Sequence, residues 1–311
     1  MARILIALGG NALGNSPQEQ QEMIENAAPS LVGLIRQGHE IIISHGNGPQ
    51  VGMINLAFET ASKYTDKIPK FQLPECTAMS QGYIGFHLQK GIKKELRKEN
   101  MPWKVASVIT QVIVDKNDEA FKNPTKPIGS FYTEEESKKM MKEDSSLIMK
   151  EDSGRGYRQL VASPKPVGIV ERESILNLLD DEFIVIACGG GGIPVVLDDN
   201  GDYKSVPAVI DKDFASAKLA ELVNADYLFI LTAVDRVAIN FGKPNQKELV
   251  DMSIDEAIKY CNEGQFAPGS MLPKVQAAMN FVSSKNGRKA IIASLENAPL
   301  AMSGESGTTI Y

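Results

Sequence analysis

The 311-residue sequence predicts an α/β fold, a three-layer αβα sandwich around a mainly parallel sheet with a small protruding subdomain. Two observations lead to this prediction. Short apolar runs typical of buried strands alternate with segments of helical periodicity along most of the chain. A long polar stretch at residues 115–170 interrupts this alternation once, and its size favours an inserted lid. We therefore expect one domain over residues 1–311, carrying an insertion.

Each expected element has a local signal. Strands are short apolar runs, and helices begin at capping residues or early prolines. Ser16, Pro17 and Glu19 start the first helix in this way, and Ser253 with Glu256 starts a later one. In chain order, we expect strands at residues 4–8, 40–44, 105–114, 183–187, 227–231 and 289–294, a hairpin turning at Asn200 and Gly201, and helices at 16–37, around 51–58, 175–179, 214–223, from 253, and around 273–283.

The polar stretch has the composition of an ordered insertion. Phe131, Tyr132 and Tyr157 provide apolar side chains that a small subdomain can bury, and the prolines of residues 163–166 mark the return of the chain. We expect this insertion to close over a site on the main body.

Composition limits the classes of function. A formal charge of −6 and a pI near 5.3 argue against a protein that binds duplex nucleic acid. The sequence enters a strand directly, without a charged leader and apolar segment, and it has no apolar stretch long enough to cross a bilayer. We expect a cytoplasmic protein with no nucleic-acid or membrane partner.

The cysteines indicate neither a disulfide framework nor a zinc site. Cys76, Cys188 and Cys261 are odd in number and far apart, and the three histidines stand at no ligand spacing from them. Buried apolar packing is the usual role of such cysteines. Cys188, beside a run of glycines, is the most plausible modifiable thiol, and we assign it no catalytic role.

Three glycine- or charge-bearing segments, at residues 6–14, 44–52 and 207–216, each begin where an apolar run ends. Glycine amides and helix N-termini at one edge of a parallel sheet would hold an anion such as phosphate. The sequence has no GxxxxGK followed by Ser or Thr, and the glycine run at residues 189–192 lacks the context of a dinucleotide site. The predicted phosphate site therefore belongs to neither of these standard classes.

Three lysines are candidates for contact with the anion. Lys126 lies between prolines in an expected turn, and Lys212 lies between Asp211 and Asp213 at an expected strand-to-helix junction. Lys274 lies near a helix start, where a cation is unfavourable unless an anion is bound. Phosphoryl transfer requires in-line positioning and positive charge, which three ammonium groups and glycine amides would supply. The two aspartates would orient lysines instead of acting as a general base, and either could also cap the helix.

Seven segments in order along the chain resemble the carbamate kinases, a family of the amino acid kinase superfamily. They are residues 7–14, 44–52, 123–133, 156–166, 208–216, 231–237 and 267–275. The resemblance implies the amino acid kinase fold and reversible phosphoryl transfer between ATP and carbamate. It also implies Mg²⁺ bound through the nucleotide phosphates with no metal ligands from the protein, a homodimer, and a role in arginine catabolism that generates ATP.

The resemblance also assigns residues. It implies catalytic roles for Lys126, Lys212, Lys274, Asp211 and Asp213. It implies carbamate or carbamoyl phosphate binding by Gly9, Gly10, Asn11, Gly46, Asn47, Gly48 and Arg158, and nucleotide binding by Thr232, Ala233, Val234, Asp235, Gly269, Ser270, Met271 and Lys274. Residues 1–205 would form the carbamate lobe and residues 206–311 the nucleotide lobe, with residues 115–170 as the lid.

Departures from related sequences bear on this assignment. Many members of the superfamily have a phosphate-binding lysine two residues before the glycine pair, where this chain has Ala7, and Lys126 on the insertion could replace its charge. Gln159 and Leu272 also differ from residues common among relatives.

The chain could instead be another small-molecule kinase of the superfamily, and a substrate screen would distinguish that function from carbamate phosphorylation. A second alternative is a nucleotide-binding regulatory protein without turnover, which would bind ligand but transfer no phosphoryl group.

Overall fold

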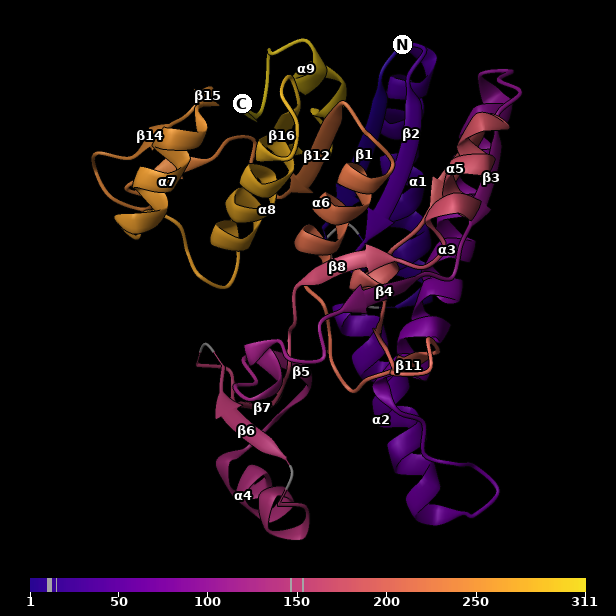
Figure 1. The fold of residues 1–311 in the computed structure, drawn as a ribbon, viewed down its shortest axis with the longest axis vertical. Coiled ribbons are helices and arrows are strands. Elements are labelled where there is room, and N and C mark those ends of the chain that lie inside the picture. The colour runs from indigo at the N-terminus through magenta and orange to yellow at the C-terminus, as the bar shows by residue number, and fades with distance from the viewer. Residues whose placement is uncertain (10–12, 15, 146, 153) are drawn as a thin grey trace.

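The computed structural model describes residues 1–9, 13–14, 16–145, 147–152 and 154–311 (Figure 1). An eight-stranded sheet forms its middle layer, in the order β15 (Asp251–Met252), β17 (Thr308–Ile310), β16 (Lys289–Ser294), β12 (Tyr227–Thr232), β1 (Arg3–Leu8), β2 (Glu40–His45), β9 (Phe183–Ile186) and β3 (Lys104–Ser107). Neighbouring strands are parallel except β16 and β17, which pair antiparallel. This confirms the expected mainly parallel sheet.

Helices cover both faces of this sheet, because successive side chains of a strand point to opposite faces. In β1, Ile4 and Ile6 are buried with α1 (Pro17–Arg36), α3 (Leu73–Lys98) and α9 (Ala298–Met302). Leu5 and Ala7 are buried on the other face, with α5 (Arg172–Asp180), α6 (Lys212–Leu222), α7 (Ile254–Asn262) and α8 (Met271–Ser283). The three-layer αβα architecture is therefore as predicted.

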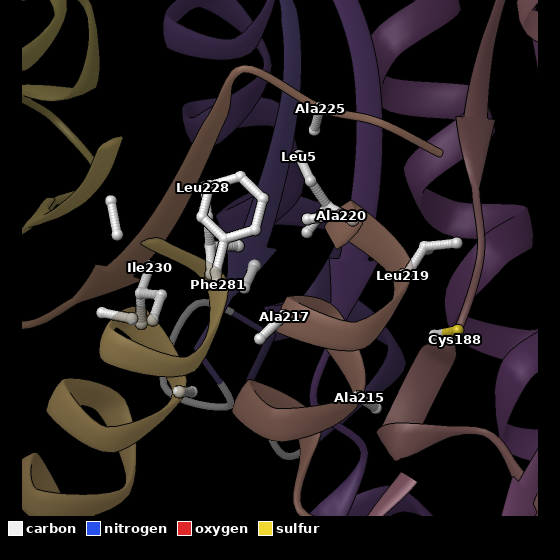
Figure 2. Close-up of a cluster of buried hydrophobic side chains, with 14 of the residues drawn as sticks. Leu5, Cys188, Ala215, Ala217, Leu219, Ala220, Ala225, Leu228, Ile230 and Phe281 are labelled. Atoms are coloured by element: carbon white, nitrogen blue, oxygen red, sulfur yellow. The ribbon is translucent and has the colours of Figure 1, made fainter. Parts of the chain in front are cut away.

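The packing of α6 and α8 sets the position of their N-termini. Phe281 of α8 shares one buried cluster with Leu228 and Ile230 of β12, to which α6 contributes Ala217 and Ala220 (Figure 2). Small side chains allow α6 to lie close to the sheet, and dense packing resists its displacement. Since α6 and α8 run antiparallel to the strands that follow them, both helices begin near the carboxyl edge of the sheet.

The described residues form three smaller sheets as well. One contains β11 (Tyr203–Ser205), β10 (Ile193–Leu197), β4 (Gln111–Val114) and β8 (Pro166–Ile169), and a hairpin pairs β13 (Ala238–Ile239) with β14 (Lys247–Glu248). The third contains β5 (Lys126–Tyr132), β7 (Tyr157–Val161) and β6 (Ile148–Glu151), next to α4 (Glu134–Glu143), and projects away from the sandwich in Figure 1. We call these last elements, residues 126–161, the protruding sheet. Short 3₁₀ helices lie at Glu119–Phe121 and Gly189–Gly191.

The protruding sheet rests on α2 (Gly48–Tyr64) through a close contact between two glycines. A Cβ atom on Gly52 would lie 3.3 Å from the Cα atom of Gly129, so glycine permits this approach. The N-terminal end of α2 lies near the carboxyl end of β2. The contact therefore positions β5 beside the carboxyl edge of the main sheet.

The structure corrects the single strand expected at residues 105–114. This segment forms β3 and β4, which belong to different sheets. Between them, the side chain of Gln81 on α3 accepts a hydrogen bond from Thr110 N and donates one to Thr110 O. Thr110 O also accepts a hydrogen bond from Ile193 N of β10 at 2.9 Å, so the backbone of Thr110 is fully paired where the chain changes sheets. The apolar run alone did not reveal this break.

Other local predictions are confirmed. Ser16 caps α1, Ser253 and Glu256 form a capping box at α7, and Gly201 turns the β10–β11 hairpin with a φ of +86°. Lys126, expected in a turn, is instead the first residue of β5 and pairs with Val161. Its direction is thus fixed by a strand ladder. Within the described part of the chain, every helix is too short or too polar to cross a membrane.

Candidate active site

The first two glycine loops meet because their strands are neighbours. β1 and β2 are parallel, with Leu8 opposite His45, and Gly46 N donates a hydrogen bond to Leu8 O at 3.1 Å. Gly9 follows β1 and Gly46 follows β2, so both begin loops at the carboxyl edge of the sheet. The predicted site residues Gly10 and Asn11 lie outside the described residues.

Three lysines and two aspartates converge at this edge. Lys126 Nζ lies 2.6 Å from Asp211 Oδ2. Lys212 Nζ lies 2.5 Å from one carboxylate oxygen of Asp213, and Lys274 Nζ lies 2.8 Å from the other. Because Lys126 comes from β5, Lys212 from α6 and Lys274 from α8, this cluster joins the protruding sheet to two helices of the main body. We call these five residues the lysine–aspartate cluster.

Asp213 is the buried centre of this cluster. Burial by itself raises the pKa of its carboxyl group, but the ammonium groups of Lys212 and Lys274 outweigh burial and hold the pKa well below its ordinary value. The carboxylate therefore stays ionised at neutral pH. It lies near the start of α8, and so provides the negative charge that a lysine in the first turns of a helix requires.

Burial has the opposite effect on Lys212. Burial lowers the pKa of its ammonium group, as does the charge of Lys274, while Asp213 favours the protonated form. The side chain is 13% exposed, compared with 36% for Lys126. Lys212 is thus a fixed cation in the body, and Lys126 is the more accessible cation above it.

Asp211 has two structural roles at once. It caps α6, because its side chain accepts a hydrogen bond from Asp213 N at 2.9 Å, and it pairs with Lys126. Ser216 fixes the first turn of α6 by donating to Lys212 O at 2.6 Å, so its hydroxyl accepts from Ser44 of β2. The backbone that carries Lys212 is therefore tied directly to the sheet.

A cavity of about 280 Å³ lies over the lysine–aspartate cluster. Its wall combines the second glycine loop, the protruding sheet and the N-terminal ends of α6 and α8. Arg158 of β7 is held there by Gly129 O at 3.1 Å and by Asp152 at 3.1 Å. The predicted site residues that line this cavity are Gly46, Asn47, Gly48, Lys126, Arg158, Asp211, Lys212, Asp213, Gly269, Ser270 and Lys274.

Two further cavities adjoin the first, and all three share Ser270 and Lys274. One of about 540 Å³ is lined by Gly9 and by Ala233. The other, of about 180 Å³, has a mostly apolar wall that includes Val234, Phe241, Phe266 and Met271, with Thr232 between the two cavities. An apolar slot beside cationic groups fits a nucleotide base with its phosphates directed toward the lysines.

Among the described residues predicted to bind the nucleotide, Asp235 lines none of these cavities. Its carboxylate accepts hydrogen bonds from Ser294 and from Asn297 Nδ2, the latter at 2.8 Å. Both bonds lower the pKa of Asp235. In the structure, it joins the loop after β12 to the loop after β16.

Sequence reasoning missed several residues at the cavities. Gly190 lines the first one, because the glycine run follows β9 at the same sheet edge as the other loops. That position was a usable signal, although the run taken alone indicated only a tight loop. Phe241 and Phe266 are 25 residues apart in sequence and had no shared pattern. Ser80 of α3, which contacts Asn47, is an isolated helical serine without any distinguishing signal.

Cys188 has the buried apolar role expected of such cysteines, and its choice as the most plausible modifiable thiol was wrong. Its side chain is completely buried, and burial raises the pKa of the thiol far above its ordinary value, so the reactive thiolate is suppressed. Figure 2 shows its sulfur within the apolar cluster. Cys261, which is partly exposed, is the more accessible thiol. Gly190, two residues later, lines the first cavity, while the side chain of Cys188 faces the core.

Comparisons with known proteins agree with this architecture. Residues 2–294 match the model of the amino acid kinase family. The chain is 56% identical to a carbamate kinase of Clostridium perfringens, over 99% of each chain, and 51% identical to the carbamate kinase-like protein YqeA of Escherichia coli, over 99% of this chain and 98% of that protein. A structure of carbamate kinase from Giardia lamblia bound to AMP-PNP has a TM-score of 0.91 and 40% identity, covering 99% of this chain and 98% of that one. The chain therefore belongs to the carbamate kinases, within the amino acid kinase family.

Proposed function

We propose that the chain transfers a phosphoryl group reversibly between ATP and carbamate, and that the lysine–aspartate cluster is its catalytic centre. One observation carries this proposal: Lys126, Lys212 and Lys274 surround one cavity beside the glycine loops. Three ammonium groups and two carboxylates give the cluster a net charge of 3 − 2 = +1. An arriving phosphate adds the negative charge that this arrangement favours.

The chemistry needs no general base. In the direction of ATP formation, a β-phosphate oxygen of ADP attacks the phosphorus atom of carbamoyl phosphate. The new P–O bond forms as the P–O bond to carbamate breaks, and the bonding electrons leave with the carbamate oxygen. Nucleophile and leaving group are both anionic oxygens, so no proton moves. The lysines stabilise charge on the transferred group, and Asp211 and Asp213 hold them in place.

The donor set of the cavity fits a metal ion that arrives with the nucleotide. Asp211 and Asp213 already bind lysines, and the described residues contain no group of three His, Cys, Asp or Glu side chains that could hold a metal. We therefore propose that nucleotide phosphates hold Mg²⁺, as hard oxygen ligands do in many kinases. When bound, the ion would neutralise phosphate charge.

Replacing Lys274 with alanine should weaken nucleotide binding as well as catalysis, because Lys274 borders all three cavities. We expect the dissociation constant for ADP to rise about tenfold, on the scale of one charge-assisted hydrogen bond, and turnover to fall. Calorimetric titration with ADP measures the first effect. Lys259→Ala, which removes an exposed lysine of α7, is the control. Unchanged ADP affinity in Lys274→Ala would contradict this role.

The lowered pKa of Lys212 predicts a pH dependence. The ammonium form is required, so kcat/KM should fall with rising pH at a pKa below 10.5, the ordinary value for lysine. A pH profile of kcat/KM for ADP reports this ionisation in the free enzyme. Lys212→Arg keeps its charge throughout the range, so its alkaline decline should move to higher pH than in the parent, even if its activity is low. A pH profile of Lys212→Arg identical to that of the parent would show that Lys212 is not the titrating group.

A substrate screen tests the proposed function against other kinases of the superfamily. The purified chain is given ATP and Mg²⁺ with carbamate, N-acetylglutamate or UMP, and ADP formation is measured. We expect phosphorylation of carbamate alone. Phosphorylation of another acceptor, or ADP binding without any turnover, would overturn the proposal in favour of a different kinase or a regulatory protein.

Finer features of the function are also proposals. Residues 115–170 would act as a lid, supported by the position of Lys126 at the cavity on an element outside the main body. Exposed Phe86 of α3 and exposed Ile109, which follows β3, support a homodimer, which sedimentation would test. ATP formation in arginine catabolism rests on the family resemblance, and the loss of ATP yield from arginine in cells lacking the gene would test it. A cytoplasmic location is also proposed, and cell fractionation would test it.

A further inference from the structure

The side-chain amide of Asn47 has a defined orientation. Its Nδ2 atom lies 2.9 Å from Ser80 Oγ, and Ser80 Oγ lies 2.7 Å from Thr77 O. A hydroxyl group has one hydrogen to donate. Since Thr77 O can only accept, that hydrogen goes to Thr77, and Ser80 must accept from Asn47. The donor end of the Asn47 amide therefore faces Ser80.

Packing holds the amide in this position. Ser80 is completely buried and Asn47 is 5% exposed. Gly190, with a φ of +66°, lies directly against the amide: a Cβ atom there would be 2.0 Å from Asn47 Nδ2 and 2.6 Å from Oδ1. Glycine is thus required at this contact. Within the described part of the chain, the amide makes its one hydrogen bond to Ser80, and Oδ1 is left as an acceptor on a residue that lines the cavity.

This acceptor differs chemically from the charged side chains around it. Lys126, Lys212, Lys274 and Arg158 present donors to the cavity, which suit the oxygens of phosphate and carboxylate. The carboxylates of Asp211 and Asp213 are engaged by lysines. A carbamoyl group also carries an NH₂ group, which can only donate. A site built entirely of donors would leave that NH₂ group unpaired.

We propose that Asn47 Oδ1 accepts a hydrogen bond from the NH₂ group of carbamate and carbamoyl phosphate, and that Ser80 is the positioning residue that selects this end of the amide. The inference rests on the proposed function and deepens it, because it names the contact by which the site distinguishes a carbamoyl group from an acetyl group. Acetyl phosphate is the matched probe: it has the same acyl phosphate linkage and a methyl group in place of NH₂.

The test compares kcat/KM for carbamoyl phosphate and for acetyl phosphate, with ADP, in the parent and in Ser80→Ala. Without Ser80, the amide loses its partner and can turn its NH₂ group toward the substrate. We expect the ratio of the two kcat/KM values to fall about tenfold, mainly through loss of carbamoyl phosphate activity. Ser137→Ala is a matched control, because Ser137 is also completely buried and also donates to a carbonyl three residues earlier, that of Glu134, at 2.8 Å. It should leave the ratio unchanged.

Equal losses of kcat/KM for both substrates in Ser80→Ala would overturn the inference, since Ser80 would then support the loop without contributing to substrate discrimination. A second measurement needs no variant. Phosphonoacetamide and acetonylphosphonate differ by NH₂ against CH₃, and the parent should be inhibited at least fivefold more strongly by the amide. Equal inhibition would also overturn it. A parent that binds ADP and turns over neither acyl phosphate would instead refute the proposed function.

Discussion

Replacing Lys126 with alanine is expected to lower the turnover number about 100-fold or more while ADP affinity changes less than about twofold. Lys126 reaches the first cavity from β5 and does not line the cavities proposed for the nucleotide. Its ammonium group would therefore stabilise the transferred phosphoryl group without contacting ADP. Steady-state kinetics with saturating ADP and a separate binding titration measure these two quantities.

The same three-stranded sheet offers a control for Lys126. Lys150 of β6 is exposed, and Lys150→Ala should retain turnover within about twofold. A normal turnover number in Lys126→Ala would place the residue outside the reaction. A large loss of ADP affinity would instead assign Lys126 to nucleotide binding, against the division of roles among the three lysines.

Replacing Asp213 with asparagine should have the largest combined effect on stability and activity. The change leaves Lys212 and Lys274 facing each other without a carboxylate, and breaking a buried ion pair in this way costs about 3 kcal/mol or more. The folded-state pKa of Asp213 is lowered, so its contribution to stability is present at neutral pH and is lost only as acid protonates it. We therefore expect a lower free energy of unfolding at pH 7 and turnover near background.

Chemical denaturation of parent and variant across pH tests this expectation. The difference between them should shrink as the pH falls through the lowered pKa of Asp213, where the parent also loses the charge. Glu221→Gln, on the same helix, is the control, because Glu221 forms a partly exposed pair with Lys218 and should cost about 1 kcal/mol or less. Equal destabilisation by Asp213→Asn and Glu221→Gln would show that the ion pairs of Asp213 do not stabilise the fold more than an exposed pair does.

The sequence predicted the framework well, since its signals are local. The apolar run of β1 lies in the centre of the sheet, and Ser16 caps α1 as expected. The split at Thr110 was missed because it depends on Gln81, a contact between segments distant in sequence. Local patterns could identify the strands but not the sheet to which each belongs.

The candidate site shows the same division. The lysines and aspartates were predictable as residues, because Lys212, Lys274 and the aspartates lie at or near helix starts and Lys126 lies between prolines. Their pairing was not: Asp211 and Asp213 both flank Lys212 in sequence, yet Asp211 binds Lys126 and caps α6, while Asp213 alone binds Lys212. The helix begins between the two aspartates and sends their side chains in different directions. Ser80 had no local signal at all, because its role depends on the orientation of the Asn47 amide.

The central claim is that this chain makes ATP from carbamoyl phosphate through the lysine–aspartate cluster. The most direct test measures ATP formed from ADP and carbamoyl phosphate with Mg²⁺, comparing the parent with Lys212→Ala and with Lys98→Ala, an exposed lysine of α3. Turnover in the parent and in Lys98→Ala, with loss of at least 100-fold in folded Lys212→Ala, is the predicted result. Undiminished turnover in Lys212→Ala, or none in a folded parent that binds ADP, would contradict the claim.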